Sequence, residues 1–425
     1  MKKAFQSHYG YLIVAAVFID LFVCGGIFFG ASGIFIVPVS TALGIGQGDF
    51  SMYLTIQSFT IAIGVIFAPK ILAKFSYRKI NAVASVIAGC GFALMGFAKN
   101  VVLLYVGGVL VGIGCVFLTY LITGTLLPRW FKQKLGTAIA IGTSGLGLGG
   151  IVFNPVISYF VSSKPLFGFT EAWRSAYVLL GGIVIIICLP LALFIIRDYP
   201  SDKGVLPYGS EFAEEKSGTK IVEGVSKSVA IKSMSFIWYG IMVVAFTLPG
   251  AIMTYLPALA SNAAPESNTS AIIGSVGMIG AIIGGFIIGA ANDKFGAQIG
   301  ALVAGGCGVL GFLVLMLGGS STVMLLGGSA LYGIFYQINQ VQMPAMVSAM
   351  YGEREYDKIF PVGAAISPWV GMVSYSLWGF LFDATKSYNA MLLAGLVCGA
   401  VTAVTGILAV SSSKKLPRES VEVKI

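Results

Sequence analysis

Long uninterrupted runs of apolar residues constrain the fold of this chain more than any other feature of its sequence. A run of about 20 apolar residues can cross the hydrocarbon core of a bilayer as an α-helix. Only 10% of the residues are charged, against roughly 25% in soluble domains. We therefore expect an all-α membrane protein with twelve transmembrane helices. The predicted spans are residues 11–37, 51–72, 80–98, 101–126, 135–160, 174–196, 234–257, 270–291, 297–317, 321–347, 359–381 and 388–411.

The positive charges lie almost entirely on one side of these spans. Of the 26 Lys and Arg residues, 22 precede the first span, follow the last or fall in alternate connections. The other 4 are Lys99, Lys164, Arg174 and Lys386. The positive-inside rule assigns the richer side to the cytoplasm. We therefore expect a multi-pass protein of the plasma (cytoplasmic) membrane with both termini in the cytoplasm. Membrane topology also explains the net charge of +9 without a nucleic-acid partner.

The longest polar stretch divides the spans into six and six. We predict an N-terminal six-helix half at 1–197, a cytoplasmic linker at 198–232, a C-terminal six-helix half at 233–412 and a cytoplasmic tail at 413–425. Paired halves around a central site are a recurring transporter design. No loop is long enough for a catalytic domain, and no phosphate-binding loop of the pattern G-x-x-x-x-G-K-[ST] occurs. The sequence therefore predicts a carrier driven by a solute gradient, and not an enzyme.

The cysteines give no sign of a metal or a disulfide framework. All six fall within predicted spans, and none forms a C-x-x-C pair. Small apolar packing residues are the interpretation that this placement favours. We expect no metal, no cofactor and a monomer.

One loop motif resembles the major facilitator superfamily. The pattern Gly289-x-x-x-Asp293-Lys294-x-Gly296 is similar to the motif between the second and third helices of each half in that family. The resemblance implies a gating role for these four residues and a fold of two six-helix halves. The matching loop of the first half departs from the pattern, because Ala73 stands where the acid should be.

Two further segments resemble one branch of that family. Arg129-Trp130-Phe131-Lys132, and the glycine-rich stretch at 136–145, are similar to the monocarboxylate porter and oxalate/formate antiporter branch. Members of that branch move small organic anions by proton symport or anion exchange, and often place a cation inside the second six helices. Here no Lys or Arg falls deep in a predicted span. An anion would therefore have to rely on hydroxyl, amide and backbone donors or on helix ends.

Asp20 is the one acidic residue near the middle of a predicted span. It lies nine residues after Tyr11, a rise of about 13 Å in an α-helix. A charge at that depth costs on the order of 2.5–3.5 kcal/mol, so the side chain should face the bundle interior. We predict a proton-coupling role. The alternatives are a partner for a cationic substrate group and a neutral acid that hydrogen-bonds another helix.

The tenth predicted span has the densest set of polar residues. Tyr332, Tyr336, Asn339 and Gln340 recur at the spacing of one helix face, which favours a cavity over contacts between helices. Phe28 lies on the same helical stripe as Asp20. The full set of predicted substrate-contact residues is Phe28, Gln57, Tyr120, Asn154, Tyr332, Tyr336, Asn339, Gln340 and Trp369.

The function predicted is secondary active transport of a small organic acid, monocarboxylate-like, by alternating access. Proton coupling and anion exchange both remain open, so the expected partners are a small-molecule substrate, protons and the lipid bilayer. A first alternative is a proton-driven exporter of amphipathic cations or drugs, which the missing cation in the spans would suit. A membrane sensor or a channel is an alternative of another class.

Overall fold

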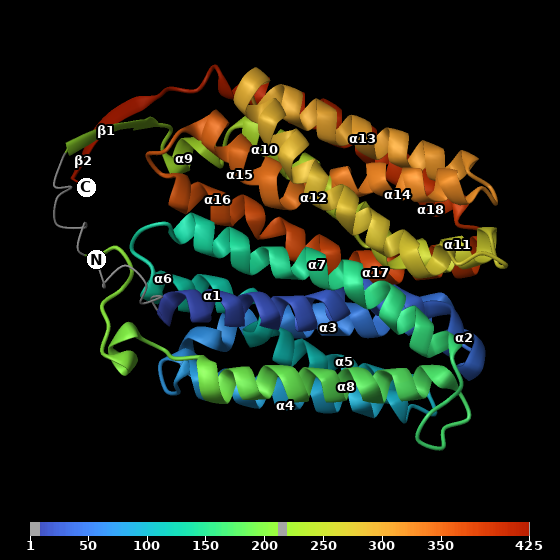
Figure 1. The fold of residues 1–425 in the computed structure, drawn as a ribbon. Coiled ribbons are helices and arrows are strands. Elements are labelled where there is room, and N and C mark those ends of the chain that lie inside the picture. The colour runs from blue at the N-terminus through green and yellow to red at the C-terminus, as the bar shows by residue number, and fades with distance from the viewer. Residues whose placement is uncertain (1–8, 211–218, 425) are drawn as a thin grey trace, which may run out of the picture. The chain divides into compact units, whose positions relative to one another are not determined.

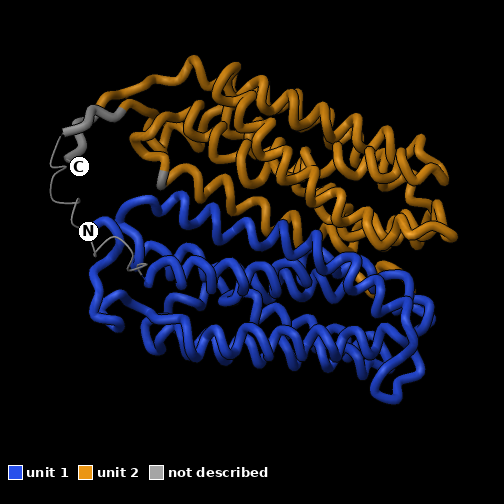
Figure 2. The backbone as a smooth tube through the Cα atoms, viewed as in Figure 1, with its two compact units in different colours: residues 1–45, 52–216 blue, residues 46–51, 217–425 orange. Residues whose placement is uncertain are grey.

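The computed structural model describes residues 9–210 and 219–424, which form two compact units. Unit 1 comprises residues 1–45 and 52–216, and unit 2 comprises residues 46–51 and 217–425 (Figure 2). Residues 1–8, 211–218 and 425 lie outside the described part. They belong to the start of the predicted N-terminal half, the predicted linker and the end of the predicted tail.

Helices make up almost all of both units (Figure 1). In unit 1 they are α1 (Tyr9–Asp20), η1 (Leu21–Ala31), η2 (Ser32–Phe35), α2 (Ile36–Leu43), α3 (Gln47–Leu72), α4 (Tyr77–Gly96), α5 (Val101–Cys115), η3 (Val116–Tyr120), α6 (Ile122–Trp130), α7 (Leu135–Ser162), α8 (Ala172–Pro190), η4 (Leu191–Ile195) and η5 (Pro200–Lys203). The first turn of α3 is assigned to unit 2.

Unit 2 adds eight longer helices, two short ones and two strands. They are β1 (Thr219–Gly224), α9 (Lys227–Ala230), α10 (Met234–Gly250), α11 (Ile252–Ala263), α12 (Thr269–Phe295), α13 (Ala297–Leu317), α14 (Thr322–Tyr336), α15 (Ile338–Tyr351), α16 (Tyr356–Ala364), α17 (Ile366–Thr385), α18 (Asn389–Ser413) and β2 (Glu419–Lys424).

The twelve predicted spans are present, and four of them are interrupted at one residue. Among the described residues, eleven helical segments are long and apolar enough to cross a membrane. The spans predicted over 101–126, 234–257, 321–347 and 359–381 are each interrupted at a single residue, namely Leu121, Ala251, Gln337 and Ala365. The break at Gln337 divides the tenth span into α14 and α15, which have 15 and 14 residues. The first predicted span is longer than expected and runs without a break from Tyr9 to Leu43.

Glycines allow η1 and α7 to approach until their backbones touch. A Cβ built on Gly149 would lie 2.0 Å from the carbonyl oxygen of Phe22, and one on Gly30 would lie 2.5 Å from the Cα of Gly150. Small residues supply this kind of close contact in membranes, where no hydrophobic effect drives helices together. The glycine-rich stretch of α7 is therefore a surface on which η1 packs.

Unit 2 also contains a two-stranded antiparallel ribbon. Strand β1 from the predicted linker pairs with β2 from the predicted tail, in a register that sets Thr219 opposite Lys424 and Gly224 opposite Glu419. Only helices were expected from the sequence. The partners lie almost 200 residues apart in the chain, so no local pattern marks their pairing.

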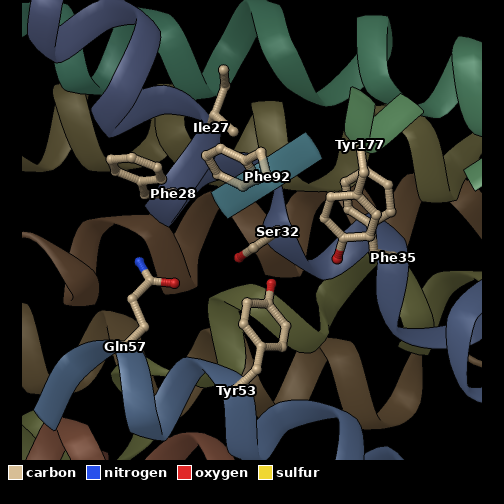
Figure 3. A pocket seen from close by; sticks show the side chains of 8 residues that line it. All are labelled: Ile27, Phe28, Ser32, Phe35, Tyr53, Gln57, Phe92 and Tyr177. Carbon is tan, nitrogen blue, oxygen red and sulfur yellow. The ribbon is translucent and has the colours of Figure 1, made fainter. Parts of the chain in front are cut away.

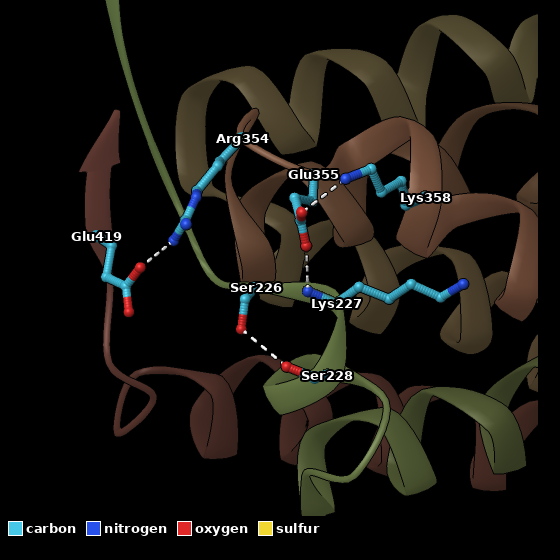
Figure 4. Close-up of polar contacts among 7 residues, drawn as sticks. All are labelled: Ser226, Lys227, Ser228, Arg354, Glu355, Lys358 and Glu419. Carbon is cyan, nitrogen blue, oxygen red and sulfur yellow. Dashed lines mark hydrogen bonds and ion pairs between the residues drawn. The ribbon is translucent and has the colours of Figure 1, made fainter. Parts of the chain in front are cut away.

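The turn between α15 and α16 anchors this ribbon (Figure 4). Arg354 pairs with Glu419 of β2. Glu355 accepts a hydrogen bond of 2.6 Å from the backbone N–H of Lys227 and one of 2.8 Å from the Lys358 ammonium. The donation from Lys227, followed by that from Lys358, lowers the pKa of Glu355 below its ordinary value. The turn therefore holds the start of α9 and the tail strand together.

A carboxylate caps the first turn of α3 within unit 2. The backbone N–H groups of Gln47 and Gly48 donate to Asp383 of α17, at 3.0 and 2.7 Å. These N–H groups have no partner inside their own helix, and an anion at a helix N-terminus also complements the helix dipole. Asp383 thus ties the end of α17 to residues 46–51.

Candidate functional site

Asp20 is completely buried in unit 1, at the point where α1 passes into the π-helical segment η1. Its Oδ2 accepts a hydrogen bond of 2.9 Å from Asn81 Nδ2 of α4, and Asn81 is completely buried as well. The other oxygen of each side chain, Oδ1 in both, has no well-formed hydrogen bond among the described residues. The acid predicted from the sequence therefore faces the protein interior and meets an amide there.

Two thiols lie close to this pair. Cys188 of α8 lies beside the Asp20 carboxyl. Its sulfur is 3.6 Å from the sulfur of Cys24, which lies one turn after Asp20 on η1. A third buried cysteine, Cys115 of α5, accepts a long hydrogen bond of 3.7 Å from Gln57 of α3. The surroundings of the acid are thus polar but uncharged.

A small enclosed pocket lies further along the same helices (Figure 3). It contains Gln57 and Phe28, two of the predicted substrate-contact residues. The hydroxyl groups of Ser32 and Tyr53 point into it from opposite sides (Figure 3). The complete lining is Ile27, Phe28, Ser32, Phe35, Tyr53, Gln57, Phe92 and Tyr177, all from unit 1.

Aromatic rings form one continuous wall of this pocket. Phe28 stacks on Phe92 with ring centroids 5.2 Å apart, Phe92 on Tyr177 at 6.4 Å, and Tyr177 on Phe35 at 3.9 Å. The space open to the centre of a water molecule is about 10 Å³, which suits one water and no organic acid. Within the described residues the Ser32 hydroxyl has no hydrogen-bond partner. In this state the pocket is therefore closed around at most a single water.

The other predicted contact residues of unit 1 lie apart from this pocket. Asn154 is completely buried, and its Nδ2 donates to the carbonyl oxygens of Gly30 and Gly150 at 2.9 and 2.6 Å. That amide therefore links η1 to α7. Tyr120 is half exposed and meets the ring of Phe29 edge-on, with centroids 6.1 Å apart.

The polar residues of the tenth predicted span differ in exposure. The break at Gln337 separates Tyr332 and Tyr336 from Asn339 and Gln340. Tyr332 is completely buried, Tyr336 is half-buried, and Asn339 and Gln340 are exposed. The exposed Asn339 and Gln340 thus lie beyond the break from the buried Tyr332, and a common cavity for these residues stays a prediction.

Tyr332 satisfies the backbone where α10 ends and α11 begins. Its hydroxyl donates to the carbonyl oxygen of Pro249 at 2.7 Å and accepts from the N–H of Met253 at 3.1 Å. A broken membrane helix leaves such groups unpaired, and a buried unpaired polar group is costly. Within unit 2, this phenol stabilises the helix break.

Tyr332→Phe is expected to destabilise the protein by about 1–3 kcal/mol, because the N–H of Met253 loses its acceptor in a buried place. Thermal unfolding of the detergent-purified protein measures the effect. Tyr336→Phe, one turn later on the same helix, serves as the matched control and should cost less. Equal stability of the two variants would contradict this role of Tyr332.

The residues of the predicted gating motif lie at the end of α12. Asp293 and Lys294 are exposed. Gly296 ends the helix with a φ of +83°, a conformation that glycine adopts without strain, and the chain then enters α13. A Cβ on Gly289 would meet nothing within 4 Å. Trp369 of α17, the last predicted contact residue, is also exposed.

In the corresponding turn of unit 1, the carboxylate comes from a residue that is distant in the sequence. Asp198, which follows η4, accepts hydrogen bonds from the N–H groups of Tyr77 and Arg78 at 2.6 and 3.1 Å and lies 3.5 Å from Arg129. It therefore caps α4 and pairs with a cation where Ala73 offers no carboxylate. No pattern in the sequence connects Asp198 with this turn.

Two units of membrane-spanning helices, one of which contains a buried acid and a small pocket with hydroxyl and amide groups beside aromatic rings, are typical of a multi-pass membrane transporter. The chain belongs to the Major Facilitator Superfamily, whose family profile matches residues 17–360. It is 24% identical to the uncharacterized MFS-type transporter YcxA of Bacillus subtilis, over 87% of this chain and 88% of that protein. It is also 24% identical to monocarboxylate transporter 12 of Mus musculus, over 94% of this chain and 84% of that protein.

Solved structures confirm the fold. The xylose transporter XylE from E. coli, in a partially occluded inward open conformation, superposes with a TM-score of 0.67 at 14% identity, over 97% of this chain and 99% of that one. A bacterial homolog of the human lysosomal transporter Spinster, inward-facing and occupied, gives a TM-score of 0.64 at 15% identity, over 96% and 97%. The predicted class of twelve helices in two halves is therefore confirmed.

Proposed function

We propose that this transporter carries a small monocarboxylate together with a proton, by alternating access, and that Asp20 is the group that binds the proton. The observation that carries this proposal is the complete burial of Asp20 against an amide and a thiol, with no cation among its partners in the described part of the chain. Burial without a cation favours the neutral acid over the carboxylate, so the group can take up a proton from water that reaches it.

The proposed substrate class is supported by the relatives of this chain and by the hydrogen-bond donors of the pocket in unit 1. Monocarboxylate transporter 12 is similar over most of both chains. The pocket of unit 1 presents hydroxyl and amide groups against a wall of aromatic rings. Such groups suit one carboxylate with a short apolar tail, once the pocket opens beyond the single water it now admits. Residues Gln57 and Phe28 are our first choice for its contacts. The other predicted contact residues and the gating motif remain proposals.

We also propose in which membrane the protein lies and on which side its termini are. The charge distribution of the connections supports a plasma-membrane protein with both termini in the cytoplasm.

The test is uptake into proteoliposomes that contain the purified protein. An inward proton gradient should drive accumulation of a radiolabelled short-chain monocarboxylate, and a protonophore should abolish it. Accumulation that ignores the protonophore but needs an anion inside would replace proton coupling by anion exchange. Gradient-driven export of a cationic dye, with no competition from any monocarboxylate, would overturn the substrate class and favour the drug exporter.

A further inference from the structure

The buried acid and its amide form an incompletely satisfied pair. One hydrogen bond, from Asn81 Nδ2 to Asp20 Oδ2, joins them. Each side chain then keeps one buried oxygen, Oδ1, without a well-formed bond among the described residues. The carboxylate oxygen and the amide oxygen both accept hydrogen bonds, so they cannot bond each other without a hydrogen between them. A proton on Asp20 Oδ1 would supply the hydrogen that both lack, and the amide oxygen of Asn81 can accept it.

We propose that Asn81 is the positioning residue of the proton site, donating to the carboxylate when Asp20 is ionised and accepting from the acid when Asp20 is protonated. This inference rests on the proposed function of Asp20 and adds the partner that sets its proton affinity. An amide suits both states because it carries a donor and an acceptor on one rigid plane. A serine or threonine hydroxyl would reach less far than the Asn81 amide, and a lysine or arginine cation would hold Asp20 in its ionised state.

The other groups around Asp20 cannot take over this role. The titratable side chains that face it are Tyr77 of α4, Cys24 of η1 and Cys188 of α8. The Tyr77 hydroxyl already donates to the carbonyl oxygen of Phe117. Thiols are weak hydrogen-bond donors. The charged groups that act on Tyr77 from beyond it are Arg129 and Asp198, which pair with each other.

A cluster of aliphatic and aromatic residues packs beside the pair among the described residues of unit 1. Buried aliphatic and aromatic residues of α1, η1, α4, α6 and η4 pack together around this level of unit 1. From α7, Gly142 and Gly145 lie against Val17 and Phe18 on the turn before Asp20. The proposal therefore needs water to reach the pair during the transport cycle and supply the proton, while the hydrogen bond from Asn81 joins α4 to α1.

The experiment measures proton-driven uptake in proteoliposomes as a function of outside pH. Asn81→Leu removes the amide that donates to the carboxylate. Because a charge-assisted bond is roughly twice as strong as a neutral one, the ionised form loses more than the acid. The midpoint of the pH profile should move upward by about one unit or more, a tenfold change in proton affinity. Asn81→Asp keeps the size of the side chain and should move it in the same direction, since two carboxyls that share a site resist double ionisation.

Ser85→Ala is the matched control, because Ser85 lies one turn further on α4, is buried, and donates its hydroxyl hydrogen to the backbone carbonyl of Asn81. Its pH midpoint should stay unchanged. A wild-type midpoint in folded Asn81→Asp, with coupling lost in Asp20→Asn, would overturn the role of Asn81 and leave the proposed function intact. Coupled accumulation that survives in Asp20→Asn would instead overturn the proposed function itself.

Discussion

Asp20→Asn is expected to abolish proton-driven accumulation of substrate while leaving exchange of substrate across the membrane. The amide cannot bind or release a proton, yet it has almost the same shape, so Asn81 keeps a hydrogen-bond partner. The ratio of inside to outside substrate should fall to about one under a proton gradient, with counterflow between loaded vesicles preserved. Radiolabelled uptake and counterflow in the same proteoliposome preparation measure the two activities separately.

The control for that variant is Asp49→Asn, which removes an exposed acid from the first turn of α3. It should accumulate substrate as the wild type does. Loss of both accumulation and counterflow in Asp20→Asn would indicate damage to the fold or to substrate binding, and would contradict the separation of roles.

Gly149→Ala should be the most destabilising of the glycine-to-alanine changes in unit 1, because its added Cβ makes the shortest contact. The new Cβ would lie 2.0 Å from the carbonyl oxygen of Phe22 and 3.0 Å from the Cα of Gly26. Both are backbone atoms, so no side chain can rotate away, and η1 must separate from α7. Overpacking of this kind costs about 1–3 kcal/mol or more. The apparent unfolding temperature of the purified protein should fall clearly, and the yield of monodisperse protein with it.

Gly182→Ala provides the comparison, because a Cβ at this position of α8 meets nothing within 4 Å. Its unfolding temperature should match or exceed that of the wild type, since alanine favours helix. If Gly149→Ala were as stable as Gly182→Ala, the contact between η1 and α7 would not be the tight one described.

Hydropathy predicted the helices well because the bilayer leaves few choices: a long apolar run must satisfy its backbone inside a helix. Interruptions of a helix inside such a run were harder to predict. Gln337 interrupts a span that reads as continuous, and its neighbours give no signal as strong as a proline. The ribbon of β1 and β2 escaped prediction because its pairing depends on two distant segments meeting.

The candidate site was predicted in part. Asp20 was found because an isolated acid in an apolar run is costly and therefore conspicuous. Asn81 was missed because an amide in a helix becomes informative only when its partner is known. Tyr332 is the opposite case, because the residue was noticed in the sequence but its structural role was not. A phenol within a span has the same sequence signal whether it lines a cavity or satisfies the backbone at a helix break.

Infrared difference spectroscopy of the membrane-reconstituted protein tests the central claim most directly, because it reports protonation of a buried carboxyl without requiring the substrate. A pH step should change a carboxylic acid C=O band in the wild type, and the band should be missing in Asp20→Asn. A band that titrates identically in both proteins, or no titrating carboxyl band in the wild type, would show that Asp20 does not exchange a proton.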